Sequence, residues 1–135
     1  MIRRLDDRTL VSGQIAPEDV AGLAEQGITM LVNNRPDGEE AGQPMAADLE
    51  AAAEAAGIAY RHVPIIRGIG PADVEAMQEA IGAAGEGKVL AFCRSGMRSA
   101  LASALAQRGQ GVAREEVEQK LTAAGFDSGP ISHLL

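Results

Sequence analysis

The sequence is poor in the residues that several classes of protein require. Its 135 residues include one cysteine, no tryptophan, one tyrosine and two phenylalanines. A single cysteine cannot form an internal disulfide, so nothing here needs an oxidising compartment. So few aromatic residues cannot build a base-stacking platform, and 12 basic against 19 acidic residues give a net charge of −7. We therefore expect no nucleic-acid partner.

The sequence also lacks the segments that enter membranes or hold metal ions. No apolar run approaches the roughly 18 residues of a membrane span, and residues 1–7 lack the continuous apolar segment of a secretory signal. Two distant histidines, one cysteine and scattered acidic residues have no metal-ligand spacing. No glycine cluster follows a strand in the order that a dinucleotide site requires. We expect a cytoplasmic protein with no membrane partner, no metal ion and no cofactor.

What is present is the composition of one globular domain, residues 1–135, with 46% hydrophobic and 23% charged residues. Apolar runs and turn residues predict strands at residues 9–12, 28–32, 58–64 and 88–92. Helices are predicted at residues 17–26, 44–56, 71–83, 98–108 and 115–124. Strands that alternate with such helices pair in parallel through right-handed crossovers. The predicted fold is therefore α/β, a three-layer sandwich with a central, mainly parallel sheet.

Ligands of such folds bind at the carboxyl ends of the strands. Three loops should meet at that edge: residues 33–43, 65–70 and 93–98. Arg35, in the first loop, has two equally supported interpretations: it binds an anionic substrate, or it pairs locally in a solvated loop.

The loop that begins at Cys93 is the most informative segment of the chain. It joins an apolar strand to a helix, contains Gly96 and carries Arg94 and Arg98. Backbone N–H groups that converge at a helix N-terminus attract anions and stabilise a thiolate. A lone cysteine after an apolar strand is more often a buried, inert side chain. A structural cysteine, however, needs neither the glycine nor the two arginines, so the combination favours a nucleophile.

We therefore predict two catalytic residues, Cys93 as nucleophile and Arg98 as the group that holds substrate charge. The predicted anion-binding residues around them are Arg94, Ser95, Gly96, Met97 and Ser99, together with Arg35.

Residues 93–99, Cys-Arg-Ser-Gly-Met-Arg-Ser, resemble the active loop of rhodanese sulfurtransferases, in which four residues separate Cys from Arg. Over residues 5–125 the chain also resembles a phosphatase-like domain family, found alone or fused to beta-lactamase-hydrolase-like proteins. The segments that carry this resemblance are residues 11–14, 33–39, 62–64 and 93–99. The scaffold of that family is similar to dual-specificity phosphatases. The resemblance implies a protein-tyrosine-phosphatase-like fold, and it implies a metallo-hydrolase or persulfide dioxygenase as a partner.

Two departures from the phosphatase pattern affect the expected chemistry. Tyrosine and dual-specificity phosphatases have five residues between Cys and Arg. Here Ser99 stands at the position of that Arg, and Arg98 lies one residue earlier. The phosphatase general acid, an Asp expected after Val63-Pro64, is replaced by Ile-Ile-Arg at residues 65–67. Asp73, the nearest acid downstream, is expected in the first turn of its helix.

From these departures the first prediction is a sulfurtransferase that carries sulfur as a persulfide on Cys93. Its partners would be a small anionic sulfur donor such as thiosulfate and a thiol or cyanide acceptor. The second hypothesis is a phosphatase that forms a phosphocysteine on Cys93. The third is a non-catalytic module that carries or senses persulfide.

Overall fold

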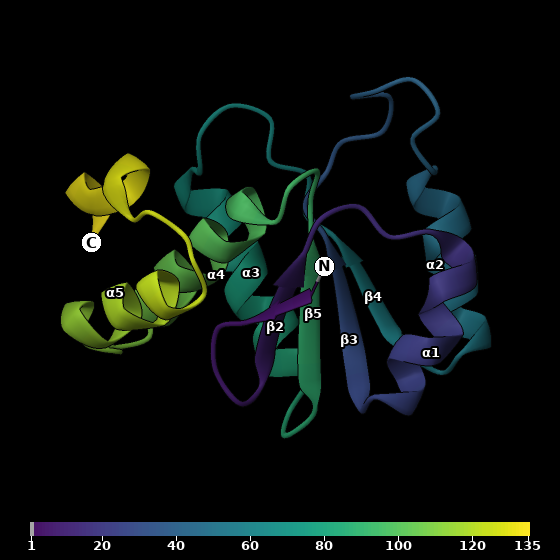
Figure 1. The fold of residues 1–135 in the computed structure, drawn as a ribbon, viewed down its shortest axis with the longest axis horizontal. Helices are drawn as coiled ribbons and strands as arrows, with labels where there is room; N and C mark the ends of the chain where they lie inside the picture. The colour runs from purple at the N-terminus through teal and green to yellow at the C-terminus, as the bar shows by residue number, and fades with distance from the viewer. Residues whose placement is uncertain (1) are drawn as a thin grey trace.

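The computed structural model describes residues 2–135 and contains one five-stranded sheet with helices on both faces (Figure 1). The strands are β1 (Ile2–Arg4), β2 (Thr9–Ser12), β3 (Ile28–Asn33), β4 (Ala59–His62) and β5 (Lys88–Phe92). Their order across the sheet is β1-β2-β5-β3-β4. All neighbours pair in parallel except β1 with β2. The predicted mainly parallel sheet is confirmed.

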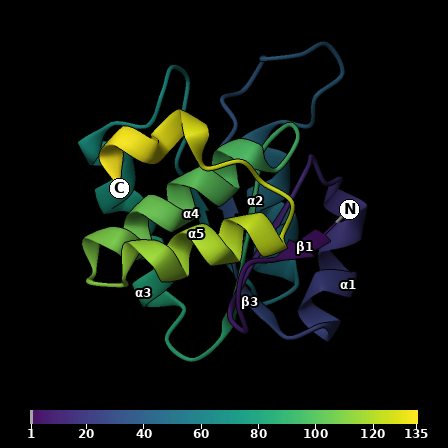
Figure 2. The same ribbon diagram turned by 60° about the vertical axis from the view of Figure 1, so that its left-hand side comes forward.

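The helices form the two outer layers. They are η1 (Pro17–Asp19), α1 (Val20–Glu25), α2 (Ala46–Ala55), α3 (Pro71–Ala83), α4 (Met97–Gly109), α5 (Arg114–Ala123) and η2 (Gly129–Leu134), where η denotes a 3₁₀ helix. In Figure 1, α1 and α2 lie on one side of the sheet and α3, α4 and α5 on the other. Figure 2 shows α5 running along the outside of α4. This arrangement confirms the predicted three-layer α/β sandwich.

The hydrophobic core is divided by the sheet into two clusters. Alternate residues of the central strands point to opposite faces, so Met30 and Val32 pack toward α3 and α4 while Leu31 packs toward α1 and α2. Both faces are buried, which explains why β3 and β5 are almost wholly apolar in sequence. Among residues 2–135, no helix is both long enough and apolar enough to span a bilayer.

The observed elements differ from the predicted ones mainly at their ends. The predicted helix at residues 17–26 begins as the 3₁₀ turn η1, and the strand predicted to end at Val32 includes Asn33. The sequence analysis did not predict β1 or η2. β1 has only three residues, two of them arginines, at an exposed sheet edge, and therefore shows no apolar alternation.

The register of the sheet brings the predicted loops together. Phe92, the last residue of β5, lies opposite Ser12 of β2 and Asn33 of β3, and Asn33 lies opposite His62 of β4. The loops that follow these four strands therefore start at one level of one sheet edge.

Candidate active site

Cys93 is the first residue after β5 and lies beneath its own loop, with 1% of its surface exposed. Its amide donates to the carbonyl of Ser12 at 3.2 Å, which continues the pairing of β5 with β2 by one residue. Its Sγ accepts the N–H of Gly96 at 3.1 Å. Gly96 is the N-cap of α4, so the sulfur lies at the positive end of a 13-residue helix.

Two glycines allow the loop of Cys93 to approach the end of β2. Gly96 has φ +95°, which side chains other than glycine rarely tolerate, and a Cβ there would lie 3.3 Å from the carbonyl carbon of Ser12. A Cβ on Gly13 would lie 3.0 Å from the carbonyl oxygen of Arg94. Ser12-Gly13 therefore supports the nucleophile loop through close backbone packing.

The loop also has N–H groups available for an anion. Within residues 2–135, the amides of Arg94 and Ser95 have no hydrogen-bond acceptor in the protein. These residues are exposed and directly follow the nucleophile. Unpaired amides at a helix N-terminus form a concave site for negative oxygen or sulfur atoms.

Arg98 is held beside this loop by a carboxylate from another segment. Its Nη1 and Nη2 each donate to an oxygen of Glu39 at 2.9 Å, and Nη1 also donates to the carbonyl of Ile65 at 2.8 Å. Three of the five N–H donors of the guanidinium are thus used, and two are left for a bound anion.

Glu39 is a permanent anion at neutral pH. Hydrogen bonds from Arg98, followed by those from Arg35, outweigh the effect of burial and lower the pKa of Glu39 to about 2. The same pairing with Glu39 raises the pKa of Arg98, and the nearby Cys93 adds a smaller contribution in that direction. Glu39 therefore orients Arg98 and does not serve as a proton donor.

Arg35 lies deeper, with 1% of its side chain exposed. Its Nε donates to Glu39 at 2.8 Å, Nη1 to Gln14 at 3.0 Å and Nη2 to Glu40 at 3.3 Å. Arg35 pairs locally, as one of the two interpretations had it, but it does so in the interior and not in a solvated loop. Because all three nitrogens are engaged inside the protein, Arg35 supports the two glutamates from below.

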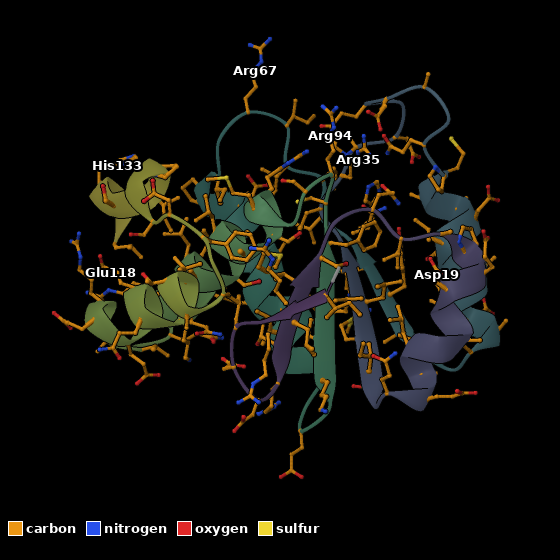
Figure 3. All side chains as sticks on the ribbon, viewed as in Figure 1. Asp19, Arg35, Arg67, Arg94, Glu118 and His133 are labelled. Atoms are coloured by element: carbon orange, nitrogen blue, oxygen red, sulfur yellow. The ribbon has the colours of Figure 1, made fainter. Side chains whose placement is uncertain are left out.

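The exposed Arg94 meets the second of these glutamates. Its Nη2 lies 3.2 Å from Glu40, whose other oxygen accepts from Arg35. Figure 3 shows Arg94 and Arg35 at the same end of the sheet, above the carboxyl ends of the strands. Three guanidinium groups therefore face two carboxylates around the loop of Cys93.

The remaining predicted binding residues divide between the rim and the interior. Ser95 and Met97 are exposed on the rim, while Ser99 is fully buried. Ser99 Oγ donates to Oδ1 of Asn34 at 2.8 Å, and Asn34 Nδ2 donates to the carbonyl of Val63 at 3.0 Å. Ser99 thus joins the start of α4 to the loops that follow β3 and β4.

Sequence reasoning missed Glu39, Glu40 and Asn34 as parts of the site. All three lie in the segment from residue 33 to residue 40 that was singled out for Arg35. Two acidic residues next to an arginine at the carboxyl edge of the sheet were the available signal.

Two further carboxyl groups near these loops cap helices. Asp73 accepts the amide of Gly70 at 2.9 Å at the start of α3, as the sequence indicated. Asp37 accepts the amide of Ala46 at 2.7 Å at the start of α2. In the part of the chain that the structure describes, no three His, Cys, Asp or Glu side chains gather as a metal ion would require.

Comparison with known proteins identifies what this site is similar to. Residues 1–110 match the family model described as the phosphatase-like domain of beta-lactamase hydrolase-like protein. The beta-lactamase hydrolase-like protein of Xylella fastidiosa (strain Temecula1) is 42% identical over 127 residues. That match covers 93% of this chain and 29% of the relative, so the chain spans less than a third of the relative's length.

Solved structures agree with the family match. A protein from Neisseria meningitidis Z2491 described as a phosphatase has a TM-score of 0.77 and 31% identity, over 98% of this chain and 92% of its own. Tk-PTP in its active form has a TM-score of 0.71 and 21% identity, over 98% of this chain and 92% of its own, which shows a shared fold. These comparisons favour the phosphatase hypothesis over the sulfurtransferase prediction, for which they offer no support.

Proposed function

Because the chain belongs to the phosphatase-like domain family of beta-lactamase hydrolase-like proteins, we propose that it is a phosphatase with the thiolate of Cys93 as its nucleophile. One observation carries the proposal. Cys93 Sγ lies at the N-terminus of α4 on the N–H of Gly96, 3.1 Å away, with the free amides of its loop and Arg98 alongside. This is an arrangement for attack on an anion whose charge must be held during the reaction.

The reaction would take place in two displacements. The thiolate of Cys93 attacks phosphorus, a P–S bond forms, and the bond to the ester oxygen breaks. That oxygen leaves with the electron pair and takes a proton from water. Water then attacks the phosphocysteine, the P–S bond breaks, and phosphate and the thiolate are released. The free amides of Arg94 and Ser95 and the two spare N–H groups of Arg98 stabilise the phosphoryl oxygens.

The substrate class follows from the carboxyl groups around the site. Glu39 is ionised at neutral pH, and Ile-Ile-Arg at residues 65–67 stands where tyrosine phosphatases carry the acidic residue that protonates the leaving group. General acid catalysis contributes roughly 10²–10⁴-fold to such reactions. We therefore expect substrates whose leaving group departs as a stable anion, such as aryl and acyl phosphates.

The test is turnover of an aryl phosphate together with intact-mass analysis of the quenched enzyme. The expected results are phosphate release at roughly 1 s⁻¹ or faster and a phosphoryl adduct that Cys93→Ser removes. Cys93→Ser should keep the circular dichroism spectrum, since the change is small. Absence of turnover in a folded wild-type protein would overturn the proposal.

A second candidate, sulfur transfer, is favoured by the loop length. Four residues between Cys93 and Arg98 make a smaller cradle than the five of tyrosine phosphatases. The Cys93 thiolate would attack the outer sulfur of thiosulfate, the S–S bond would break, and sulfite would leave. A thiol or cyanide would then take the outer sulfur from the Cys93 persulfide. No leaving-group acid is needed because sulfite departs as an anion.

Incubation with thiosulfate and cyanide separates this candidate from the first. Thiocyanate formation would support sulfur transfer, while a sulfur adduct without turnover would support the persulfide-carrier hypothesis. If neither appears, sulfur chemistry at Cys93 is excluded for this donor. We also propose a cytoplasmic location and, from the family resemblance, a metallo-hydrolase or persulfide dioxygenase as partner.

A further inference from the structure

Of the two carboxylates beside the nucleophile loop, Glu40 is the more loosely held. Its Oε2 lies 3.2 Å from Nη2 of Arg94, and its Oε1 accepts from Arg35 at 3.3 Å. Glu39, by contrast, is held by Arg35 and Arg98 at 2.8–2.9 Å. The side chains of Arg94 and Glu40 are 66% and 49% exposed, so water surrounds their ion pair and weakens it. The pair of Glu40 with Arg94 therefore opens at little cost.

Opening this pair requires only that the side chain of Glu40 turns, because the backbone of its loop is held by other contacts. Gln43 donates from Nε2 to the carbonyl of Pro36 at 2.8 Å, and its Oε1 accepts the amide of Glu40 at 3.2 Å. In Figure 1 this loop, between β3 and α2, lies above the carboxyl edge of the sheet. The carboxylate of Glu40 is thus free to leave Arg94 for water while the loop stays in place.

Arg94 lies where an anion bound at Cys93 needs positive charge. It directly follows the nucleophile, and its own amide has no acceptor within residues 2–135. Its side chain extends at the same end of the sheet as Arg35 (Figure 3). In the described part of the chain, that side chain forms an ion pair with Glu40 alone. An anion held by the Cys93 loop and the carboxylate of Glu40 therefore need the same guanidinium.

We propose that Glu40 is an internal competitor for Arg94: it occupies the guanidinium in the free protein, and an anion that binds at Cys93 displaces it. The inference rests on the proposed function and deepens it by naming a residue that sets the affinity for substrate and product. Two negative groups close to one cation repel each other, so each weakens the binding of the other. The return of Glu40 to Arg94 then favours release of the phosphate product.

The test is calorimetry with inorganic sulfate, a tetrahedral dianion that the enzyme cannot hydrolyse, at constant ionic strength. Glu40→Gln keeps the shape of the side chain and removes its charge. Sulfate should bind this variant about threefold to fivefold more tightly than the wild type, since an exposed ion pair contributes up to about fivefold to an equilibrium constant. Glu79→Gln is the matched control, because Glu79 also pairs with a partly exposed arginine, Arg61, at 2.8 Å and its loss changes the net charge equally. The control should change the affinity by less than about 1.5-fold.

A double-mutant cycle shows whether the effect passes through Arg94. In a protein that already carries Arg94→Gln, the further change Glu40→Gln should tighten sulfate binding by less than about 1.5-fold. Circular dichroism should show all variants folded, since each change is at an exposed side chain. Equal affinities of wild type and Glu40→Gln, an equal gain in Glu79→Gln, a full gain without Arg94, or no sulfate binding by any variant would each overturn the inference.

Turnover separates failure of this inference from failure of the proposed function. In an active enzyme, Glu40→Gln should also lower the inhibition constant of inorganic phosphate against an aryl phosphate by about threefold to fivefold. If no variant hydrolyses the ester but sulfate affinity responds to Glu40 as described, only the proposed function fails. If the enzyme is active and neither sulfate affinity nor phosphate inhibition responds to Glu40→Gln, only the inference fails.

Discussion

At the scale of single residues, Glu39 connects two arginines from different parts of the chain. It accepts from Arg35, four residues before it, and from Arg98 on α4. Charge-assisted hydrogen bonds of this kind, with two parallel N–H···O contacts, fix a guanidinium in direction as well as position. The orientation of Arg98 toward the Cys93 loop therefore depends on the negative charge of Glu39.

Glu39→Gln tests this dependence, because the amide keeps the shape and loses the charge. Hydrogen bonds to charged groups are worth about 1.5–3 kcal/mol, so kcat/KM for an aryl phosphate should fall about 10- to 100-fold. The control is Glu118→Gln, which breaks the exposed Arg114–Glu118 pair on α5. Steady-state kinetics should show no change in the control; equal rates for Glu39→Gln and wild type would contradict the role of Glu39.

The same variant has a predictable dependence on pH. The pKa of Glu39 is about 2 in the folded protein against an ordinary value of 4.5. A lowered pKa contributes stability above the unfolded value and loses it as the pH falls through the folded value. The difference in thermal midpoint between wild type and Glu39→Gln should therefore be constant above about pH 4.5 and shrink between pH 4.5 and 2. A difference that does not vary over this range would show that Glu39 acts through shape alone.

At the scale of elements, the end of β2 and the loop after β5 support each other. They pack backbone to backbone, because Gly13 lies against the carbonyl of Arg94 and Gly96 against that of Ser12. Backbone atoms cannot rotate away as a side chain would, so an added methyl group must displace one of the two loops.

Gly13→Ala should displace the loop of Cys93. A Cβ at 3.0 Å from the Arg94 oxygen is expected to cost about 1–2 kcal/mol in the free energy of unfolding and to lower kcat/KM about tenfold. Gly22→Ala, in α1, is the matched control because its Cβ would meet nothing within 4 Å. Urea unfolding should show the control to be stabilised by roughly 0.5–1 kcal/mol. A Gly13→Ala variant as active and as stable as the wild type would contradict the close packing of Gly13 against Arg94.

At the scale of the whole molecule, α5 is tied to the opposite end of the sheet from Cys93. Lys120 Nζ lies 3.2 Å from Asp6 and 3.0 Å from Oε1 of Gln107 on α4. Burial favours the neutral form of Asp6, but the amide of Arg8 and the ammonium of Lys120 outweigh it and lower the pKa of Asp6. The Lys120 side chain is only 23% exposed.

Lys120→Met should weaken this attachment and spare the site. Loss of a partly buried ion pair is expected to cost about 1–2 kcal/mol in the free energy of unfolding. kcat/KM should stay unchanged, because Asp6 precedes β2 while Cys93 follows β5 at the other edge. Lys88→Met, at an exposed position of β5, is the control and should stay within about 0.5 kcal/mol of wild type. A fall in kcat/KM for Lys120→Met in a folded protein would contradict the separation of the two ends.

Local patterns in the sequence were sufficient for the elements and for the position of the nucleophile. Apolar runs, proline at first helical turns and glycine after helices predict the alternation of strands and helices, which fixes a mainly parallel sheet and places Cys93 at its carboxyl edge. Asp73 was likewise expected in the first turn of its helix, and it lies in the first turn of α3. These features depend on neighbours within a few residues, so the sequence carries them directly.

The tertiary structure alone decided how the charges are paired. Glu39 meets Arg98 from 59 residues away, and Lys120 meets Asp6 from 114 residues away. A cavity beside Arg98 likewise lies between the loop after β4 and η2. Pairs between charged side chains that are distant in sequence produce no periodic pattern. The sequence therefore does not distinguish an arginine buried among glutamates from an exposed one. Only the packed sheet and helices determine that Arg35 lies inside while Arg94 and Arg98 border the site.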